Sequence, residues 1–591
     1  MKFLGNIDPD KYMFINTIYN RKSNEQKEDV LYVIYKDRET GEKFVKTIKE
    51  PTMDYYIVKD EARDFDYHKD FMPLDKLDKI TCKYKNVSFD VANQGGKQWK
   101  GYIQHCLDSG NYRDIHKIHG MYNYAFGSDI PIETWYKIQY LIEYGSDNIN
   151  FPITKQFLDI EVDGIDVEGF PEPGECPINA VTIIDDESRT SYTFLLRNEK
   201  NPQIQEFEDD IEAFKEELHN DFDESYGVFD YKFLMYDKEI DLIKDMFKLI
   251  HTLKRDFILI WNMSFDIPYI IARINRLGYE HEPIVCHPDF HNKSAYYVKS
   301  KTKVVEARTD RFACNCYSTF LDQMVIYAGL RKGQGVLPSK KLNDVGRAEL
   351  KDEKLDYSEE ANIKTLPYVD YKKFVKYNIK DVLLQYGINK KTEDLEELYI
   401  RTLLSATPYE RAFKQTTFLK NRAYVSYFKQ GYVICNNKPL DGEQDEDRRN
   451  IIKTIFDEER PETDDEDEQF PGALVANPTY NSNTGVVIFG KNSAYVYDFV
   501  TDEDFSAMYP SITIVFNISG ASLIGKLILD IPIDKIKHFY EVSDKDIKQW
   551  DAGREFIENY ICNNPTMVGN IWFNLPTGEE LIDKFAKRGN I

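Results

Sequence analysis

The chain has 591 residues, of which 42% are hydrophobic, 14% aromatic and 30% charged, and its formal net charge is −25. This length exceeds one hydrophobic core and predicts roughly three or four domains, while the apolar content excludes disorder throughout. A net negative charge disfavours DNA binding by the surface as a whole, since affinity for DNA comes largely from Lys and Arg side chains that contact phosphates. The distribution of charge matters more than its sum, so a nucleic-acid partner stays compatible with the sequence.

The sequence contains no apolar run of roughly 18 residues and no charged-then-apolar leader, so we expect a soluble, cytoplasmic protein without a membrane partner. For a viral protein this compartment is the host cytoplasm. The eight cysteines are scattered and form no C-x-x-C pair. This pattern argues against structural zinc and predicts free thiols in a reducing compartment.

Residues 1–150 are expected to form an N-terminal mixed α/β domain rich in short strands. Within it, DVLYVIYKD and FVKTIKE flank the turn RETGEK and predict a hairpin. Residues 151–395 alternate strands with helices, which predicts an α/β domain with a central mixed sheet. The strands are expected at QFLDIEV, NAVTIIDD, SYTFLLR and FILIW, and the helices at KEIDLIKDMFKLIHTLKRD and IPYIIARINRLG.

Residues 396–591 begin with two helical patterns and continue into an acidic run at 441–468. Such a run is typical of a solvated loop or a disordered insertion. A strand-rich stretch then leads to the string DFSAMYPS.

Asp159 and Glu161 lie in the predicted strand QFLDIEV. Side chains of a strand alternate between faces, so these two carboxylates point the same way, about 7 Å apart along the strand. Together they suit hard divalent cations, which prefer oxygen ligands. Taken alone, the pair also fits an ordinary exposed surface.

Asp266 follows the buried strand FILIW at the beginning of a helix, at the edge of an α/β sheet where ligands usually bind. The alternative is that Asp266 caps the helix that begins at Ile267. Asn262, in the same turn, either contacts substrate or satisfies backbone groups.

Tyr377 and Asp381 are four residues apart on a predicted helix and therefore share one face. A phenol beside a metal-binding carboxylate can orient an attacking water. The alternative is a half-buried tyrosine beside a surface acid. All four acids together suit two-metal phosphodiester hydrolysis, in which both ions stabilise the charge that develops on the phosphate.

The strings DIEVDG, NMSFD and YNIKD resemble the three motifs of proofreading 3′→5′ exonucleases, which share a ribonuclease-H-like fold. The form Y-x-x-x-D resembles the third motif of family B DNA polymerases. The resemblance implies a site with two Mg²⁺ or Mn²⁺ ions, in which Tyr377 positions the water. It assigns metal binding to Asp159, Glu161, Asp266 and Asp381. It assigns substrate contact to Asn262 and Phe265.

DFSAMYPS resembles motif A of the same family, which implies that Asp504 binds metal at a polymerase centre and that Tyr509 packs under the deoxyribose. Ala507 and Met508 depart from the usual motif and put the nucleotide contacts in doubt. FPGALV resembles a template-contacting segment and places Gly472 there.

The family's D-T-D and K-x-x-x-N-S-x-Y-G strings are absent from this sequence. We therefore expect an N-terminal portion of a family B replicative polymerase, similar to those of tailed bacteriophages, with an incomplete α+β palm and no DNA synthesis alone. A separate C-terminal polymerase chain and replisome proteins are the expected partners besides DNA. Two alternatives stay open, namely a stand-alone trimming nuclease and a non-catalytic nucleic-acid-binding scaffold subunit.

Overall fold

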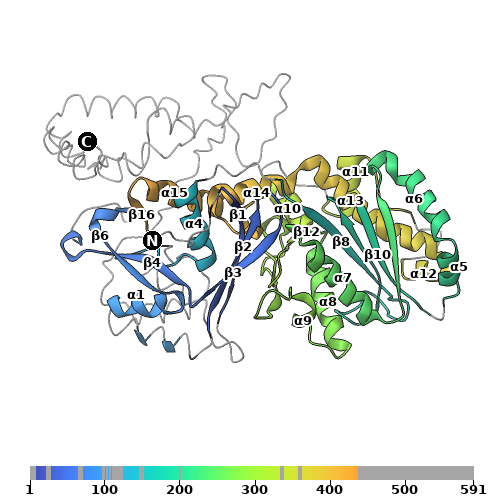
Figure 1. Cartoon of the computed structure of the whole chain (residues 1–591), viewed down its shortest axis with the longest axis horizontal. Helices are drawn as coiled ribbons and strands as arrows, with labels where there is room; N and C mark the ends of the chain where they lie inside the picture. The colour runs from blue at the N-terminus through green and yellow to red at the C-terminus, as the bar shows by residue number, and fades with distance from the viewer. Residues whose placement is uncertain are drawn as a thin grey trace, which may run out of the picture. The chain divides into compact units, whose positions relative to one another are not determined.

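The structure is a computed structural model that describes part of the chain (Figure 1). It describes residues 8–436, except residue 9 and the ranges 22–27, 64–70, 96–99, 102–103, 106–107, 109–123, 146–151, 199–200, 333–338 and 357–362. Gly472, Asp504, Tyr509 and the acidic run lie outside the described residues, so their assignments stay predictions. Residues 1–63 and 72–441 belong to one compact unit. The domain boundaries near 150 and 395 also stay predictions.

A six-stranded mixed sheet forms the centre of the described α/β structure. Its strand order is β11-β10-β9-β8-β12-β15. β9 is antiparallel to both β8 and β10. β11 runs parallel to β10, β12 runs parallel to β8, and β15 runs parallel to β12. The strands are β8 (Lys155–Val162), β9 (Ile178–Asp185), β10 (Thr190–Leu196), β11 (Asp230–Tyr236), β12 (Phe257–Ile260) and β15 (Thr319–Asp322). The predicted mixed sheet and its expected strands are therefore confirmed.

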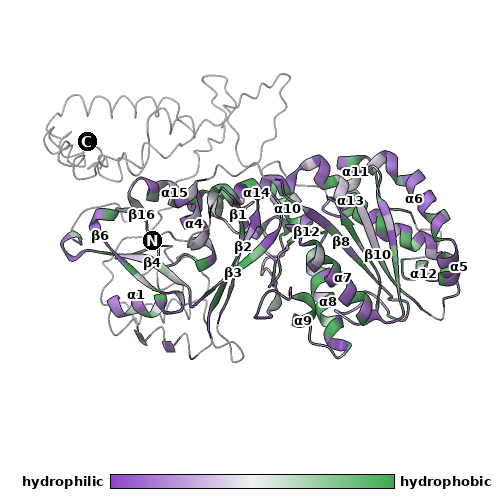
Figure 2. Ribbon diagram, in the orientation of Figure 1, coloured by the Kyte–Doolittle hydropathy of each residue, from purple (hydrophilic) through white to green (hydrophobic). Residues whose placement is uncertain are grey.

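Two hydrophobic cores cover opposite faces of this sheet, and the side-chain alternation of β8 divides between them. Phe157 belongs to the core that contains α13 (Tyr371–Thr392). Leu158 and Ile160 belong to the core of α7 (Glu239–Leu253) and α8 (Met263–Arg276). Since strand side chains alternate, Asp159 and Glu161 share the α13 face with Phe157. Figure 2 shows hydrophobic β12 within the sheet and a largely hydrophilic α6 (Ile211–Tyr226) outside it.

Helix α8 begins earlier than the sequence predicts. Asn262 is its N-cap in a left-handed conformation, with φ 69° and ψ 51°, and Asp266 lies in the first turn. The interpretation of Asp266 as the N-cap is therefore wrong. The reason is that a left-handed Asn262 ends β12 and starts the helix directly, and asparagine tolerates this conformation better than most residues.

The predicted N-terminal hairpin is present as β2 (Val30–Asp37) and β3 (Lys43–Lys49), which are antiparallel. β1 (Tyr12–Asn20) pairs with the other edge of β2. A second antiparallel sheet has the order β6-β4-β7. Its strands are β4 (Thr52–Val58), β6 (Leu77–Lys83) and β7 (Ala125–Phe126).

The remaining described elements surround these sheets. The strands are β5 (Phe71–Pro73), β13 (Ala295–Val298), β14 (Arg311–Cys314) and β16 (Tyr432–Ile434). The helices are α1 (Val87–Gly95), α4 (Ile132–Tyr144), α5 (Gln203–Asp209), α9 (Glu282–Val285), α10 (Gln323–Leu330), α11 (Leu342–Leu350), α12 (Leu366–Val369), α14 (Asp394–Ser405) and α15 (Gln415–Lys429). Among the described residues, no helix combines the length and hydropathy needed to cross a membrane.

Candidate active site

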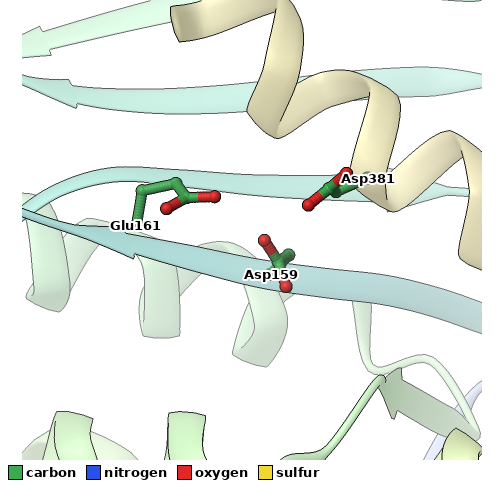
Figure 3. Close-up of side chains that lie close together, drawn as sticks. All are labelled: Asp159, Glu161 and Asp381. Atoms are coloured by element: carbon green, nitrogen blue, oxygen red, sulfur yellow. The ribbon is translucent and has the colours of Figure 1, made fainter. Parts of the chain in front are cut away.

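Three acidic side chains meet between strand β8 and helix α13. Asp159 and Glu161 extend from β8, and Asp381 extends from α13 toward them (Figure 3). One carboxylate oxygen of each lies within 4.8 Å of the others. The alternation of β8 and the packing of α13 on its face thus bring together residues more than 200 positions apart.

Asp266 lies outside this group of three but interacts with it electrostatically. Its side chain is buried at the start of α8. Burial, followed by the negative charge of Asp159, raises the pKa of Asp266 well above its usual value. Backbone hydrogen bonds at Asp266 and Ile160 act in the opposite direction and favour its ionised form.

The three clustered acids are difficult to ionise together. Burial and the charge of Asp381 raise the pKa of Asp159 to about 7. Burial and the charge of Asp159 raise the pKa of Glu161 well above its usual value. Burial likewise raises the pKa of Asp381, against the effect of Lys354. Like charges in a poorly solvated space have this effect, and a cation reverses it.

Lys354 supplies a positive charge at the edge of the cluster. Its ammonium contacts Asp381 Oδ2 and lies 3.1 Å from the Tyr377 hydroxyl. Burial lowers the pKa of Lys354, but the charges of Asp381, Tyr377 and Asp159 raise it well above its usual value. Burial and Asp381 raise the pKa of Tyr377, so the phenol keeps its proton. The Tyr377 hydroxyl can therefore act as a hydrogen-bond donor.

Asn378 orients the first acid of the site. Its Nδ2 donates to Asp159 Oδ2 at 3.2 Å. Its Oδ1 accepts a hydrogen bond from the Thr182 hydroxyl on β9 at 2.5 Å. The amide is fully buried, so both contacts fix its orientation.

The two residues assigned to substrate contact lie in the turn and first helical turn after β12. Asn262 Oδ1 accepts a hydrogen bond from the Ser264 hydroxyl at 2.9 Å. Phe265 is partly buried, and its ring centroid is 5.1 Å from that of Phe170, whose side chain is 77% exposed. The pair leaves an aromatic surface open to solvent near the start of α8. Substrate contact by Asn262 and Phe265 stays a prediction.

Lys354 and Asn378 are site residues that reasoning from the sequence missed. Asn378 follows Tyr377 directly, and a polar residue inside a buried helix was the available signal. Lys354 lies in the irregular stretch after α11, and its neighbours KDEKLD look like an ordinary charged loop. Only the tertiary structure places its ammonium at Asp381.

The donor set fits a hard divalent cation. All three clustered side chains offer oxygen, which Mg²⁺ and Mn²⁺ prefer. Asp381 Oδ1 is buried and has no hydrogen-bond partner among the described residues. A buried acceptor of this kind is costly without a partner, and a cation would satisfy it.

Comparison with known proteins relates part of the chain to one family. Residues 105–316 match the family model described as the exonuclease domain of DNA polymerase family B. These residues therefore carry a family B exonuclease domain. The matched range includes Asp159, Glu161 and Asp266, whereas Tyr377 and Asp381 lie beyond it.

A particular relative is the DNA-directed DNA polymerase of Escherichia phage RB69, to which this chain is 24% identical over 408 residues. The similarity covers 67% of this chain and 39% of the phage protein. The chain thus spans about two fifths of the length of this curated relative.

Proposed function

We propose that this chain carries a metal-dependent 3′→5′ exonuclease that removes terminal nucleotides from DNA by a two-metal reaction. The observation that carries the proposal is the convergence of Asp159, Glu161 and Asp381 within 4.8 Å, where Asp159 and Glu161 lie in the range matched to a family B exonuclease domain. The central strand order, with β9 and β8 in the middle and β12 beside β8, supports a ribonuclease-H-like arrangement. The phage polymerase relative supports DNA as the substrate.

Asp159, Glu161 and Asp381 would hold two Mg²⁺ or Mn²⁺ ions, with Asp266 as a further ligand beside Asp159. When bound, the ions supply charge stabilisation to the phosphate and acidify a water. Each acid must then be ionised, and the raised pKa values oppose this until positive charge arrives.

Tyr377 has a separate task at the edge of the site. Its protonated hydroxyl orients a water for attack on the terminal phosphodiester, and Lys354 at 3.1 Å fixes the position of that hydroxyl. Phe265, with Phe170 beside it, offers the terminal base an aromatic surface. We assign proofreading as the biological use of this reaction.

The test is digestion of 5′-labelled single-stranded DNA by the purified chain with Mg²⁺ or Mn²⁺. We expect a ladder that shortens from the 3′ end, no cleavage with EDTA, and none after Asp159→Ala with Glu161→Ala. Blocking the 3′ end and repeating the reaction on matched RNA distinguishes DNA end trimming from other nuclease activities. Undiminished cleavage by the double variant would contradict the assignment.

Metal binding gives a second readout that does not depend on cleavage. Because the ions bind only the folded site, Mn²⁺ should raise the Tm of the wild-type protein and leave that of the double variant unchanged. An absent shift together with absent cleavage would favour the scaffold alternative.

A further inference from the structure

Asp352 and Lys380 form an ion pair beside the site, and the proposed reaction does not use this pair. Lys380 Nζ lies 2.5 Å from Asp352 Oδ2, and the Tyr226 hydroxyl donates to the same oxygen at 2.6 Å. Burial raises the pKa of Asp352, but hydrogen bonds from Lys380 and Tyr226 hold it below its usual value. The Lys380 side chain is only 6% exposed, and a buried ammonium requires a carboxylate.

This ion pair ties down a stretch of chain without regular secondary structure. Residues 352–356 form neither helix nor strand. The backbone N–H of Lys354 donates to Asn343 Oδ1 of α11 at 2.8 Å. A Cβ at Gly346 would lie 2.9 Å from the Asp352 carbonyl oxygen. The stretch therefore lies directly on α11, and Asp352 ties it to α13 as well.

Two ion pairs of opposite sense join this stretch to one turn of α13. Asp352 pairs with Lys380, and Lys354 pairs with Asp381, the next residue of the helix. If the stretch shifted so that Asp352 approached Asp381, or so that Lys354 approached Lys380, like charges would meet. Such a meeting costs free energy at short distance. The two pairs consequently define where the stretch lies along the helix.

We propose that Asp352 and Lys380 are positioning residues of the nuclease site, which act by holding the Lys354 ammonium at Tyr377 and Asp381. The inference rests on the proposed function, because its consequence is a correctly placed Tyr377 hydroxyl. Asp352 is not one of the three clustered acids, whereas the Lys380 ammonium also favours the ionised form of Asp381 through its charge.

The test replaces the pair by apolar side chains of similar size, Asp352→Leu with Lys380→Met, in the full chain. This exchange avoids an unpaired buried charge, so the fold is expected to persist. We expect kcat on single-stranded DNA to fall about tenfold, as is usual for partners that orient a metal-site group, with KM within about twofold. Thermal unfolding of each variant checks that the Tm is retained.

A double-mutant cycle with Lys354→Met separates positioning from a general structural effect. If the pair acts through Lys354, its removal in the Lys354→Met background should change kcat less than about twofold. The matched control is Lys376→Met, which removes the α13 lysine that pairs with Glu217 and Asp221 of α6 and should leave kcat unchanged. The inference would be overturned if the losses in kcat from the ion pair and from Lys354→Met multiplied independently. It would also be overturned if the variant Asp352→Leu with Lys380→Met kept the wild-type kcat. An inactive wild-type chain would overturn the proposed function, and the inference with it.

Discussion

Lys354 provides the described site with its positive charge. Three carboxylates within 4.8 Å repel one another, and the ammonium at Asp381 offsets part of that repulsion. The same ammonium lies 3.1 Å from the Tyr377 hydroxyl. Lys354 therefore contributes both to the charge balance of the site and to the orientation of the phenol.

Removal of the Tyr377 hydroxyl should slow the proposed reaction. Tyr377→Phe deletes one hydroxyl but keeps the ring that packs in the buried helix. We expect kcat to fall about tenfold, the equivalent of one hydrogen bond of about 1.4 kcal/mol, with the Mn²⁺-induced Tm shift retained. Wild-type activity in this variant would remove Tyr377 from the mechanism.

The raised carboxylate pKa values predict how stability depends on pH. A carboxyl whose pKa is higher in the folded than in the unfolded chain binds more protons when folded, so stability falls as pH rises between the two values. For Asp159 this window runs from its ordinary value of 3.8 to about 7. Without metal, the wild-type Tm should therefore fall from pH 5 to pH 8.

Asp159→Asn provides the comparison for this pH effect. It removes the titrating group, so its Tm should fall less over the same range. Saturating Mg²⁺ should also reduce the fall in the wild type, because the ion stabilises the ionised form. A wild-type Tm that fell no more than that of the variant would contradict the raised pKa.

At the scale of elements, the loop after β8 fixes the helix that carries Asp266. The Tyr269 hydroxyl of α8 both donates to and accepts from the backbone of Cys176. Arg273 donates to the Gly174 carbonyl at 3.2 Å. Gly174 has φ 72°, and a Cβ there would lie 2.7 Å from the Ala272 and Arg273 backbone. Only glycine permits this approach.

Gly174→Ala should therefore destabilise the fold by about 2–4 kcal/mol, from a strained φ and a clash with helix backbone. Gly278→Ala is the matched control, since Gly278 has φ 84° with nothing within 4 Å of an added Cβ. It carries the conformational penalty alone, about 1 kcal/mol. Urea unfolding measures both, and equal losses would show that the close approach is unimportant.

At the scale of the whole described molecule, a buried ion cluster joins the N-terminal sheet to the central sheet. Asp256 lies directly before β12, and its oxygens are 2.9 Å from Lys36 Nζ and 2.7 Å from Lys43 Nζ. Burial would raise the pKa of Asp256, but the two lysines lower it to about 2. Thr154 donates to the same carboxylate from its backbone and hydroxyl.

Asp256→Asn should cost about 3–5 kcal/mol of unfolding free energy, because it leaves two buried ammonium groups without their carboxylate. The control is Asp60→Asn, which breaks an exposed pair with Arg63 and should cost less than about 1 kcal/mol. Urea unfolding compares the two variants. A loss of similar size in both would show that the junction contributes little.

The main strands and helices of the central α/β structure, and the acids proposed for the site, can be predicted from local patterns in the sequence. Helical spacing of apolar residues predicted α7, and short apolar stretches predicted β8 and β12, since burial leaves a local pattern in the sequence. The spacing of Asp159 with Glu161, and of Tyr377 with Asp381, follows from local geometry in the same way. The N-cap at Asn262 was not predictable, because its left-handed backbone depends on the packing of α8.

The charge balance of the site could not be predicted in this way, because it depends on contacts between distant parts of the chain. Lys354, Asp352 and Lys380 look like ordinary loop and helix charges in the sequence, and their meaning depends on how residues 352–354 lie against α13. Likewise, Lys36 and Lys43 carry no sign that they meet Asp256. Periodicity records which side of an element is buried, whereas pairing between distant charges requires the folded arrangement of several elements.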